Sequence, residues 1–194
     1  VNPIYGSIQK LHTRDTNLIA LCEDKILKIL AHKDALYNAD GNPQLIATNR
    51  VLGQTTPFIG EYGISKNPES FASESYRAYF TDKVRGSVMR LSKDGLTPIS
   101  EHGMKDYFQD NLSLQDKIIG SYDTRKSLYN ISFDYMQYFT VERTVAEFPL
   151  GLQYATASFS EKTKGWVTFK SFQPETAFST VSYTHLTLPT IYSV

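Results

Sequence analysis

The chain has 194 residues, 41% of them hydrophobic, which is enough to bury one medium-sized core. Its 20 Lys and Arg balance its 20 Asp and Glu, and this neutrality argues against a dedicated binder of nucleic acid or membrane surfaces, which usually carries excess positive charge. No apolar run approaches the roughly 20 residues of a membrane-spanning helix, and no signal peptide is recognised.

The first predicted element is a β-hairpin. Two apolar runs, Asn17–Cys22 and Lys25–Ala31, flank the acidic pair Glu23-Asp24, a pattern typical of two strands and a turn. A helix over residues 17–31 is the alternative. The 13 tyrosines and 11 phenylalanines of the chain favour strands in general.

A long loop insertion is expected after this hairpin. The polar stretch His32–Arg50 contains the turn signals Asp40-Gly41 and Asn42-Pro43. Glycines and a proline then predict irregular structure through Val51–Ile64.

The stretch Phe71–Ser100 predicts one up-and-down sheet of four short strands. The segments FASES, YRAYFTD, SVMRLS and LTPIS alternate or run apolar and are separated by tight turns. Gly86 and Gly95 stand where a hairpin turn needs a positive φ, a conformation that disfavours residues with a Cβ.

One short helix and two further hairpins follow. The helix is predicted over Glu101–Leu112, because four apolar residues share a helical face: Met104, Tyr107, Phe108 and Leu112. The hairpins are predicted at Lys117–Phe133 and Ala155–Phe172, and apolar and polar residues alternate in the second from Trp166 onward.

Three segments of the chain resemble one another: YFTDKVRGSVMRL, GSYDTRKSLYNIS and SFSEKTKGWVTFK. Their acids Asp82, Asp123 and Glu161 lie about 40 residues apart, a spacing typical of β-propeller blades. We therefore predict an all-β, mainly antiparallel fold that is part of a β-propeller-like array of short four-stranded sheets with one short helix. A β-sandwich with similar hairpins is the alternative.

The acids in these segments are interpreted as structural, because such side chains bond the backbone downstream and fix a turn. No residue is expected to be catalytic, to bind a cofactor or to bind a metal, since the histidines are isolated and no phosphate loop, nucleophile elbow or zinc motif is present. The lone Cys22 is expected to be a small buried side chain. The predicted structural turn residues are Asp82, Gly86, Asp94, Gly95, Asp123, Glu161 and Gly165.

Basic residues gather in the predicted turns. The default interpretation is that they form a solvent-exposed surface. The more specific interpretation is that they form a positively charged rim that binds an anionic partner such as DNA or an acidic neighbouring subunit. These residues are Lys83, Arg85, Arg90, Lys93, Arg125, Lys126, Lys162 and Lys164.

The predicted organisation has three parts: residues 1–64 with the hairpin and loop insertion, residues 65–180 with the repeated sheets, and residues 181–194. The last part begins with VSYTHLTLPT (Val181–Thr190), which resembles the translation of an adapter used in sequencing libraries. Residues 181–194 are therefore expected to be a non-native tail of a metagenomic fragment.

Several long motifs resemble virion structural proteins of tailed bacteriophages, namely the nozzle or muzzle tail proteins of marine and crAss-like phages. They are CEDKILKILAHKDALYNADGN, GEYGISKNPESFA, YRAYFTDKVRGSVMRLSKDGLTPIS and FSEKTKGWVTFKSFQPE. The resemblance spans roughly Ile4–Glu175. It implies β-propeller modules and rings around the DNA channel, and it gives no catalytic residues to carry over to this chain.

The resemblance implies a non-enzymatic structural component of a phage tail, located in the virion. The expected partners are further copies in a homo-oligomeric ring, other tail subunits and, by non-specific contact, phage DNA. A receptor- or glycan-binding tail module, contacting sugars through aromatics and loops such as 39–43, is the alternative; a glycan-cleaving enzyme would need two converging acids. The candidate interface residues are Tyr76, Tyr79, Tyr122, Tyr129 and Trp166.

Overall fold

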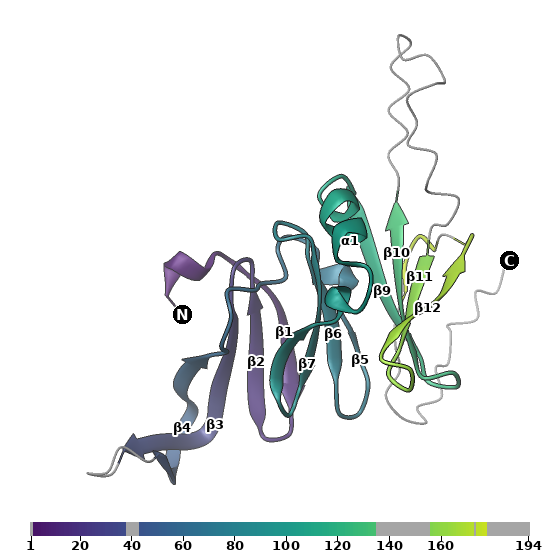
Figure 1. Ribbon diagram of the computed structural model, residues 1–194. Helices are drawn as coiled ribbons and strands as arrows, with labels where there is room; N and C mark the ends of the chain where they lie inside the picture. The colour runs from purple at the N-terminus through teal and green to yellow at the C-terminus, as the bar shows by residue number, and fades with distance from the viewer. Residues whose placement is uncertain (1, 38–42, 135–155, 173, 178–194) are drawn as a thin grey trace, which may run out of the picture.

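The computed structural model describes residues 2–37, 43–134, 156–172 and 174–177. In this part of the chain, three four-stranded antiparallel sheets follow one another and lie face to face, with one short α-helix beside them (Figure 1). Within each sheet the strands are neighbours in the order in which they occur in the sequence. The expected all-β, mainly antiparallel class with one short helix is therefore confirmed.

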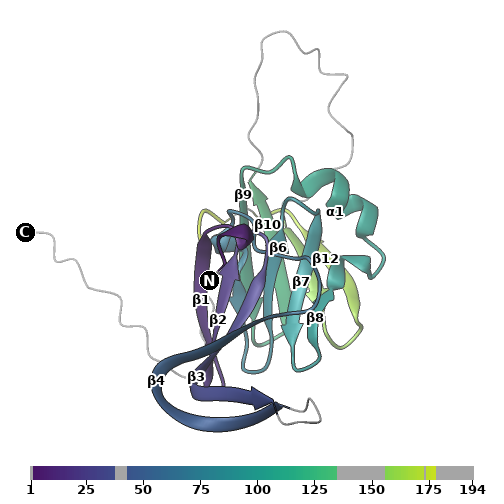
Figure 2. The same ribbon diagram turned by 90° about the vertical axis from the view of Figure 1, so that its left-hand side faces the viewer.

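The first sheet contains four strands that follow the 3-10 turn η1 (Pro3–Tyr5): β1 (Ile8–Arg14), β2 (Asn17–Cys22), β3 (Ile26–Tyr37) and β4 (Pro43–Pro57). The predicted hairpin is confirmed as β2 and β3, so the helix alternative is wrong. The loop expected over His32–Arg50, and the irregular structure expected over Val51–Ile64 as far as Pro57, are wrong, because β3 and β4 form a long antiparallel pair there with irregular register around Ala31. Figure 2 shows this pair curving beyond the other strands.

The second sheet confirms the four strands predicted over residues 71–100. After the 3-10 turn η2 (Pro68–Ser70) come β5 (Ala72–Ser73), β6 (Ala78–Asp82), β7 (Ser87–Ser92) and β8 (Gly95–Pro98). The chain then forms the 3-10 turn η3 (Ile99–Glu101) and helix α1 (Lys105–Leu112), which begins four residues later than predicted.

The third sheet contains both predicted C-terminal hairpins: β9 (Lys117–Asp123) with β10 (Leu128–Asp134), and β11 (Thr156–Ser160) with β12 (Gly165–Lys170). Because β10 also pairs with β11, the two hairpins form one sheet. Val181–Thr190, the predicted foreign tail, lies outside the described residues, as does most of the loop at 39–43.

The core has two main layers, one on each face of the second sheet. Alternation along β6 directs Tyr79 toward the third sheet and Phe80 toward the first, and both side chains are fully buried. A two-sheet sandwich would leave one face of each sheet outside the core, whereas here the second sheet is covered on both faces.

Helix α1 fills the space between the second and third sheets on the side away from their first strands. The predicted apolar face is confirmed, because Phe108 and Leu112 are fully buried and Met104 and Tyr107 pack against the same core. The ring of Phe108 lies 4.6 Å from that of Trp166 and 6.4 Å from that of Phe133, measured between centroids.

The predicted repeat of about 40 residues does not describe successive sheets. Asp123 ends β9 and Glu161 follows β11, so two of the three similar segments belong to the same sheet. What the segments share is a hairpin loop of four residues whose last residue has a left-handed φ: Gly86 at 61°, Ser127 at 55° and Lys164 at 50°. The sequence similarity reflects this common loop geometry.

Candidate functional site

The described residues present their most developed polar cluster where the second and third sheets meet. The Glu161 carboxylate extends from the β11–β12 loop to the second sheet, where it accepts a hydrogen bond from the Tyr79 hydroxyl at 2.9 Å. Its other oxygen lies 2.9 Å from Nη1 of Arg90 and 3.7 Å from Nε of Arg77. The Glu161 side chain is only 13% exposed, so this ion cluster is shielded from much of the solvent.

Three stacked tyrosines lie next to this cluster. The Tyr79 ring lies between Tyr129 and Tyr122, with centroid distances of 4.8 and 5.7 Å and nearly parallel planes. Burial raises the pKa of Tyr79, and the neighbouring Glu161 charge raises it further, while burial alone raises the pKa of Tyr129. Both phenols are therefore held neutral and act as hydrogen-bond donors.

Backbone contacts bring the same two sheets close together. A Cβ on Gly120 of β9 would lie 1.9 Å from the carbonyl oxygen of Ser70 in η2, so only glycine fits there. The Tyr129 hydroxyl donates to that same carbonyl at 2.8 Å. At the other side of the core, Nε1 of Trp166 donates to the Ile99 carbonyl at 3.1 Å.

The first and second sheets are joined through Asp82, a buried carboxylate at the end of β6. It accepts hydrogen bonds from the N–H of Gly63 at 3.0 Å and the hydroxyl of Ser65 at 3.1 Å, both in the segment that follows β4. It also accepts from the N–H of Arg85 at 3.1 Å, and Nη1 of Arg85 lies 3.0 Å away. Asp82 therefore fixes its own turn, as predicted, and also connects two sheets.

Arg14 joins the opposite ends of the same two sheets. Its guanidinium donates to the carbonyl of Ser92 at 3.0 Å and to the carbonyl of Tyr76 at 3.1 Å. Neither this contact nor the role of Ser70 has a local sequence signal, because the partners lie tens of residues away in the chain.

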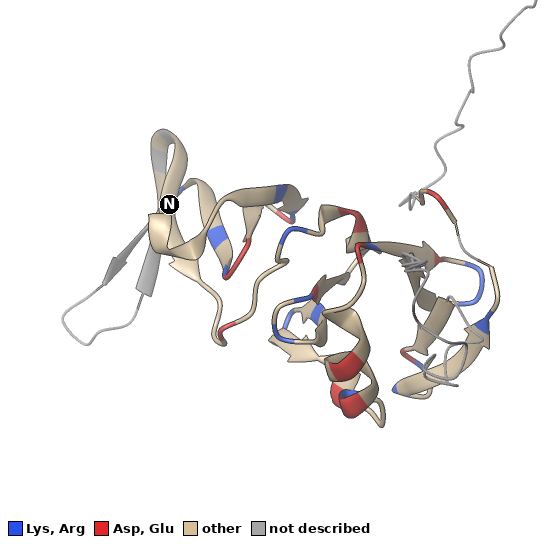
Figure 3. Cartoon of the chain, turned by 90° about the horizontal axis from the view of Figure 1, so that it is seen from above, with Lys and Arg blue, Asp and Glu red and all other residues tan. Residues whose placement is uncertain are grey.

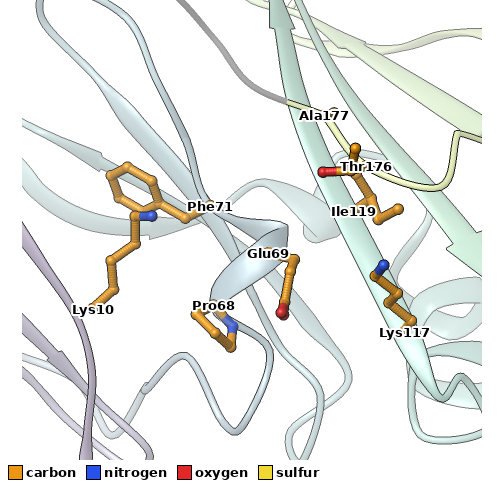
Figure 4. Close-up of a pocket in the computed structure, with 8 residues that line it drawn as sticks. All are labelled: Lys10, Pro68, Glu69, Phe71, Lys117, Ile119, Thr176 and Ala177. Carbon is orange, nitrogen blue, oxygen red and sulfur yellow. The ribbon is translucent and has the colours of Figure 1, made fainter.

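The first strands of the three sheets lie at a common edge of the molecule. Nζ of Lys10 in β1 lies 5.0 Å from the Phe71 ring, which precedes β5, and β5 contacts β9. A shallow pocket of about 300 Å³ lies at this edge, between Lys10 on one side and Lys117 and Ile119 of β9 on the other (Figure 4). Residues of the first and third sheets meet there with the segment of η2 and Phe71 that precedes β5.

The predicted turn residues have different roles. Gly86 and Gly95 have φ values of 61° and 98°, as predicted, and Asp123 accepts from the N–H groups of Arg125 and Lys126 within its own turn. Asp94 lies in the two-residue β7–β8 loop, where its N–H donates to the Ser92 hydroxyl.

Two turn predictions require correction. The left-handed residue of the β11–β12 loop is Lys164, and Gly165 is the first residue of β12, because the loop closes one residue earlier than the alignment implied. Glu161 is the first residue of that loop, and its carboxylate binds the neighbouring sheet, which differs from the turn-fixing role predicted for it.

The candidate interface aromatics belong mainly to the interior. Tyr79 and Tyr129 are fully buried within the chain, so the prediction that they contact another subunit is wrong. Tyr122 and Trp166 are partly buried against the same core. Tyr76 is 70% exposed and remains an interface candidate.

Two of the histidines that are isolated in the sequence pack against phenylalanine rings. The His12 ring packs on Phe71 at 5.0 Å, and burial lowers its pKa, whereas His102 packs on Phe159. Within the described ranges, no group of three or more His, Cys, Asp and Glu residues is placed to hold a metal ion. Cys22 is buried and free, as predicted.

In the same part of the chain, no helix is long and apolar enough to cross a membrane. A scan against models of protein families finds no matching family, and a search of curated proteins finds no matching relative.

Proposed function

We propose that this chain is a non-enzymatic structural component of a phage tail, in which the three sheets are successive blades of a β-propeller-like array. The observation that carries this proposal is the face-to-face packing of consecutive four-stranded sheets whose first strands share one edge. Propeller blades have this strand order and this arrangement around a central axis. The resemblance of the sequence to nozzle-like tail proteins supports the same conclusion.

The polar chemistry between the sheets supports a mechanical role. The two most buried carboxylates at the junctions, Asp82 and Glu161, are each bound by an arginine and by hydrogen-bond donors from a neighbouring segment. A carboxylate held in this way stabilises one relative position of the sheets. If the sheets move apart, the ion pair breaks and its charges are left poorly solvated. The junctions therefore resist sliding of one sheet over the next.

The proposed partners are further copies in a homo-oligomeric ring around the DNA conduit and other tail subunits, and the proposed location is the virion. Rings form when one surface binds a different surface of the next copy until the circle closes. The exposed Tyr76 and the basic loops of the third sheet are available for such contacts or for non-specific contact with DNA. Of the exposed aromatics described, Tyr76 lies in the β5–β6 loop of the second sheet, whereas Phe169 and Phe172 lie in and just after β12 of the third, so the three do not share one sheet, as a single glycan-binding patch on a sheet would require.

The test is mass spectrometry of gradient-purified phage particles from a host infected with a phage that encodes this protein. The expected result is recovery of peptides from residues 2–177 in the particles, in amounts similar to those of other tail proteins. Uninfected cells treated identically provide the control. Peptides that appear in the infected lysate but not in the particles would refute the proposal.

A further inference from the structure

The ends of the third sheet differ in charge. At one end lie the β9–β10 and β11–β12 loops, with four exposed cations that we call the basic hairpin end: Arg125, Lys126, Lys162 and Lys164. At the other end lies α1, with two exposed acids that we call the acidic helix end: Asp106 and Asp110. Figure 3 shows acidic residues on the helix, and Figure 1 places the loops at the opposite end of the strands.

The register of the sheet fixes the separation of these two ends. Phe133, which contacts the α1 rings of Tyr107 and Phe108, pairs with Ile118, whereas Leu128 pairs with Asp123 at the loops. Five residues of strand separate the two positions along β10, which corresponds to about 17 Å. Helix α1 spans part of this length, because the Phe108 ring also lies 4.6 Å from that of Trp166, the second residue of β12.

Acids near the basic hairpin end are already bound inside the molecule. The Glu161 carboxylate faces the second sheet and is bound by Arg77, Arg90 and Tyr79. Oδ1 of Asp123 accepts two backbone N–H groups of its own turn, at 3.0 and 3.2 Å. The four cations of this end therefore keep their charge toward solvent. Burial lowers the pKa of the nearby Lys170 ammonium, and the charge of Lys126 lowers it further.

Near the acidic helix end the cations, rather than the acids, are bound inside the molecule. The Lys83 ammonium donates to the Gln115 carbonyl, and Arg85 is held by Asp82 at 3.0 Å and Asp24 at 3.5 Å. Asp106 and Asp110 are exposed one helical turn apart, so they project from the same side of α1. One exposed cation of α1, Lys105, directly precedes Asp106.

We propose that the basic hairpin end of one copy binds the acidic helix end of a second copy, which joins the chains head to tail along the strand direction. The two surfaces are different and complementary in charge, so each copy can bind one neighbour at each end. This inference rests on the proposed structural role and identifies the contact that would build the assembly.

The test is sedimentation velocity of the chain over a range of concentrations, at about 50 mM and about 500 mM salt, where the Debye length falls from about 14 Å to about 4 Å. The expected result is concentration-dependent association at low salt, weakened about tenfold or more at high salt. A chain that stays monomeric at low salt would overturn the proposal. If that monomer instead bound DNA in a salt-dependent way, the basic hairpin end would be a nucleic-acid-binding surface.

A charge exchange makes the test specific. Lys162→Glu/Lys164→Glu and Asp106→Lys/Asp110→Lys should each weaken self-association at least about tenfold, and an equimolar mixture of the two should associate again. Lys33→Glu, which reverses a lysine of the first sheet that donates to the Thr16 hydroxyl, controls for net charge and should associate like the wild type. Failure of the mixture to associate, with both variants folded by circular dichroism, would refute the contact. Recovery of the chain in phage particles is measured independently, so the two proposals can fail separately.

Discussion

The close contact at Gly120 allows a quantitative test of how the sheets are held together. In the Gly120→Ala variant, the added Cβ would lie 1.9 Å from the Ser70 carbonyl oxygen, whereas a carbon and an oxygen approach to about 3.3 Å even in a favourable contact. Both groups belong to the backbone, so no side chain can rotate to relieve the overlap. The third sheet must therefore move away from η2 by more than an ångström.

The cost has two parts. Overpacking of a tight core typically costs about 1–3 kcal/mol. The displacement also breaks the hydrogen bond from the Tyr129 hydroxyl to the same carbonyl, which contributes about 1 kcal/mol. We expect the free energy of unfolding to fall by about 3 kcal/mol, which corresponds to a decrease in Tm of about 10 °C for a chain of this size.

The assay is a urea titration followed by the fluorescence of Trp166, the chain's one tryptophan, whose ring packs on the same core. Gly165→Ala is the matched control, because its Cβ would meet no atom closer than 3.8 Å, and it should change stability by less than about 1 kcal/mol. If the two variants unfold at the same urea concentration, the contact does not constrain the junction and the reasoning is wrong.

Three further predictions concern the junctions. Glu161→Gln should lower the free energy of unfolding by about 2 kcal/mol in a urea titration, because Arg90 loses its charged partner in a largely buried position; no change at all would contradict the role of the ion cluster. Because burial raises the pKa of Tyr129 above its unfolded value of about 10, its contribution to stability is complete below about pH 10 and is lost above it, by about 1.4 kcal/mol per pH unit. Titrations between about pH 9 and pH 11 should show this decline, and Tyr129→Phe should reduce its slope; equal slopes in both proteins would count against it. Gly86→Ala should destabilise more than Gly95→Ala by about 1–2 kcal/mol in thermal denaturation, since both have positive φ but only the Cβ at Gly86 would meet Gln109, with Cα at 2.6 Å.

The hairpins were predictable because their signals are local. Gly95 requires a positive φ, and the apolar residues on either side of it alternate with a period of two, so turn and strands are both encoded within a few residues. The same holds for the apolar face of α1, where Phe108 and Leu112 lie one turn apart and are both buried. In such stretches the local backbone conformation and the burial of apolar side chains are both determined by neighbouring residues.

The arrangement of the hairpins was less predictable. The loops at Ser127 and Lys164 resemble the loop at Gly86 because all three close in the same way, and loop closure carries no information on which sheet a hairpin joins. The polar stretch after His32 was interpreted as a loop, but the cross-strand pairing that makes it a strand comes from residues distant in the chain.

The candidate site was predicted in composition but not in geometry. Glu161 was recognised as a notable acid, yet its partners Tyr79 and Arg90 lie about 70–80 residues earlier, and no spacing rule links them. Tyr79 and Tyr129 were identified as important aromatics, but from sequence alone a tyrosine that stacks inside the core cannot be distinguished from one at a subunit interface.

The position of α1 has a consequence for the curvature of the array. The first strands of the second and third sheets touch, while Phe108 and Trp166 separate the two sheets farther out, so the volume of these rings sets the angle between the sheets. Between the first and second sheets the same outer space is filled by side chains of a connecting segment, including Phe58 and Tyr62. Different side chains thus separate the sheets at each junction. A single large-to-small change such as Phe108→Ala would reduce the angle between the second and third sheets without altering the angle between the first and second.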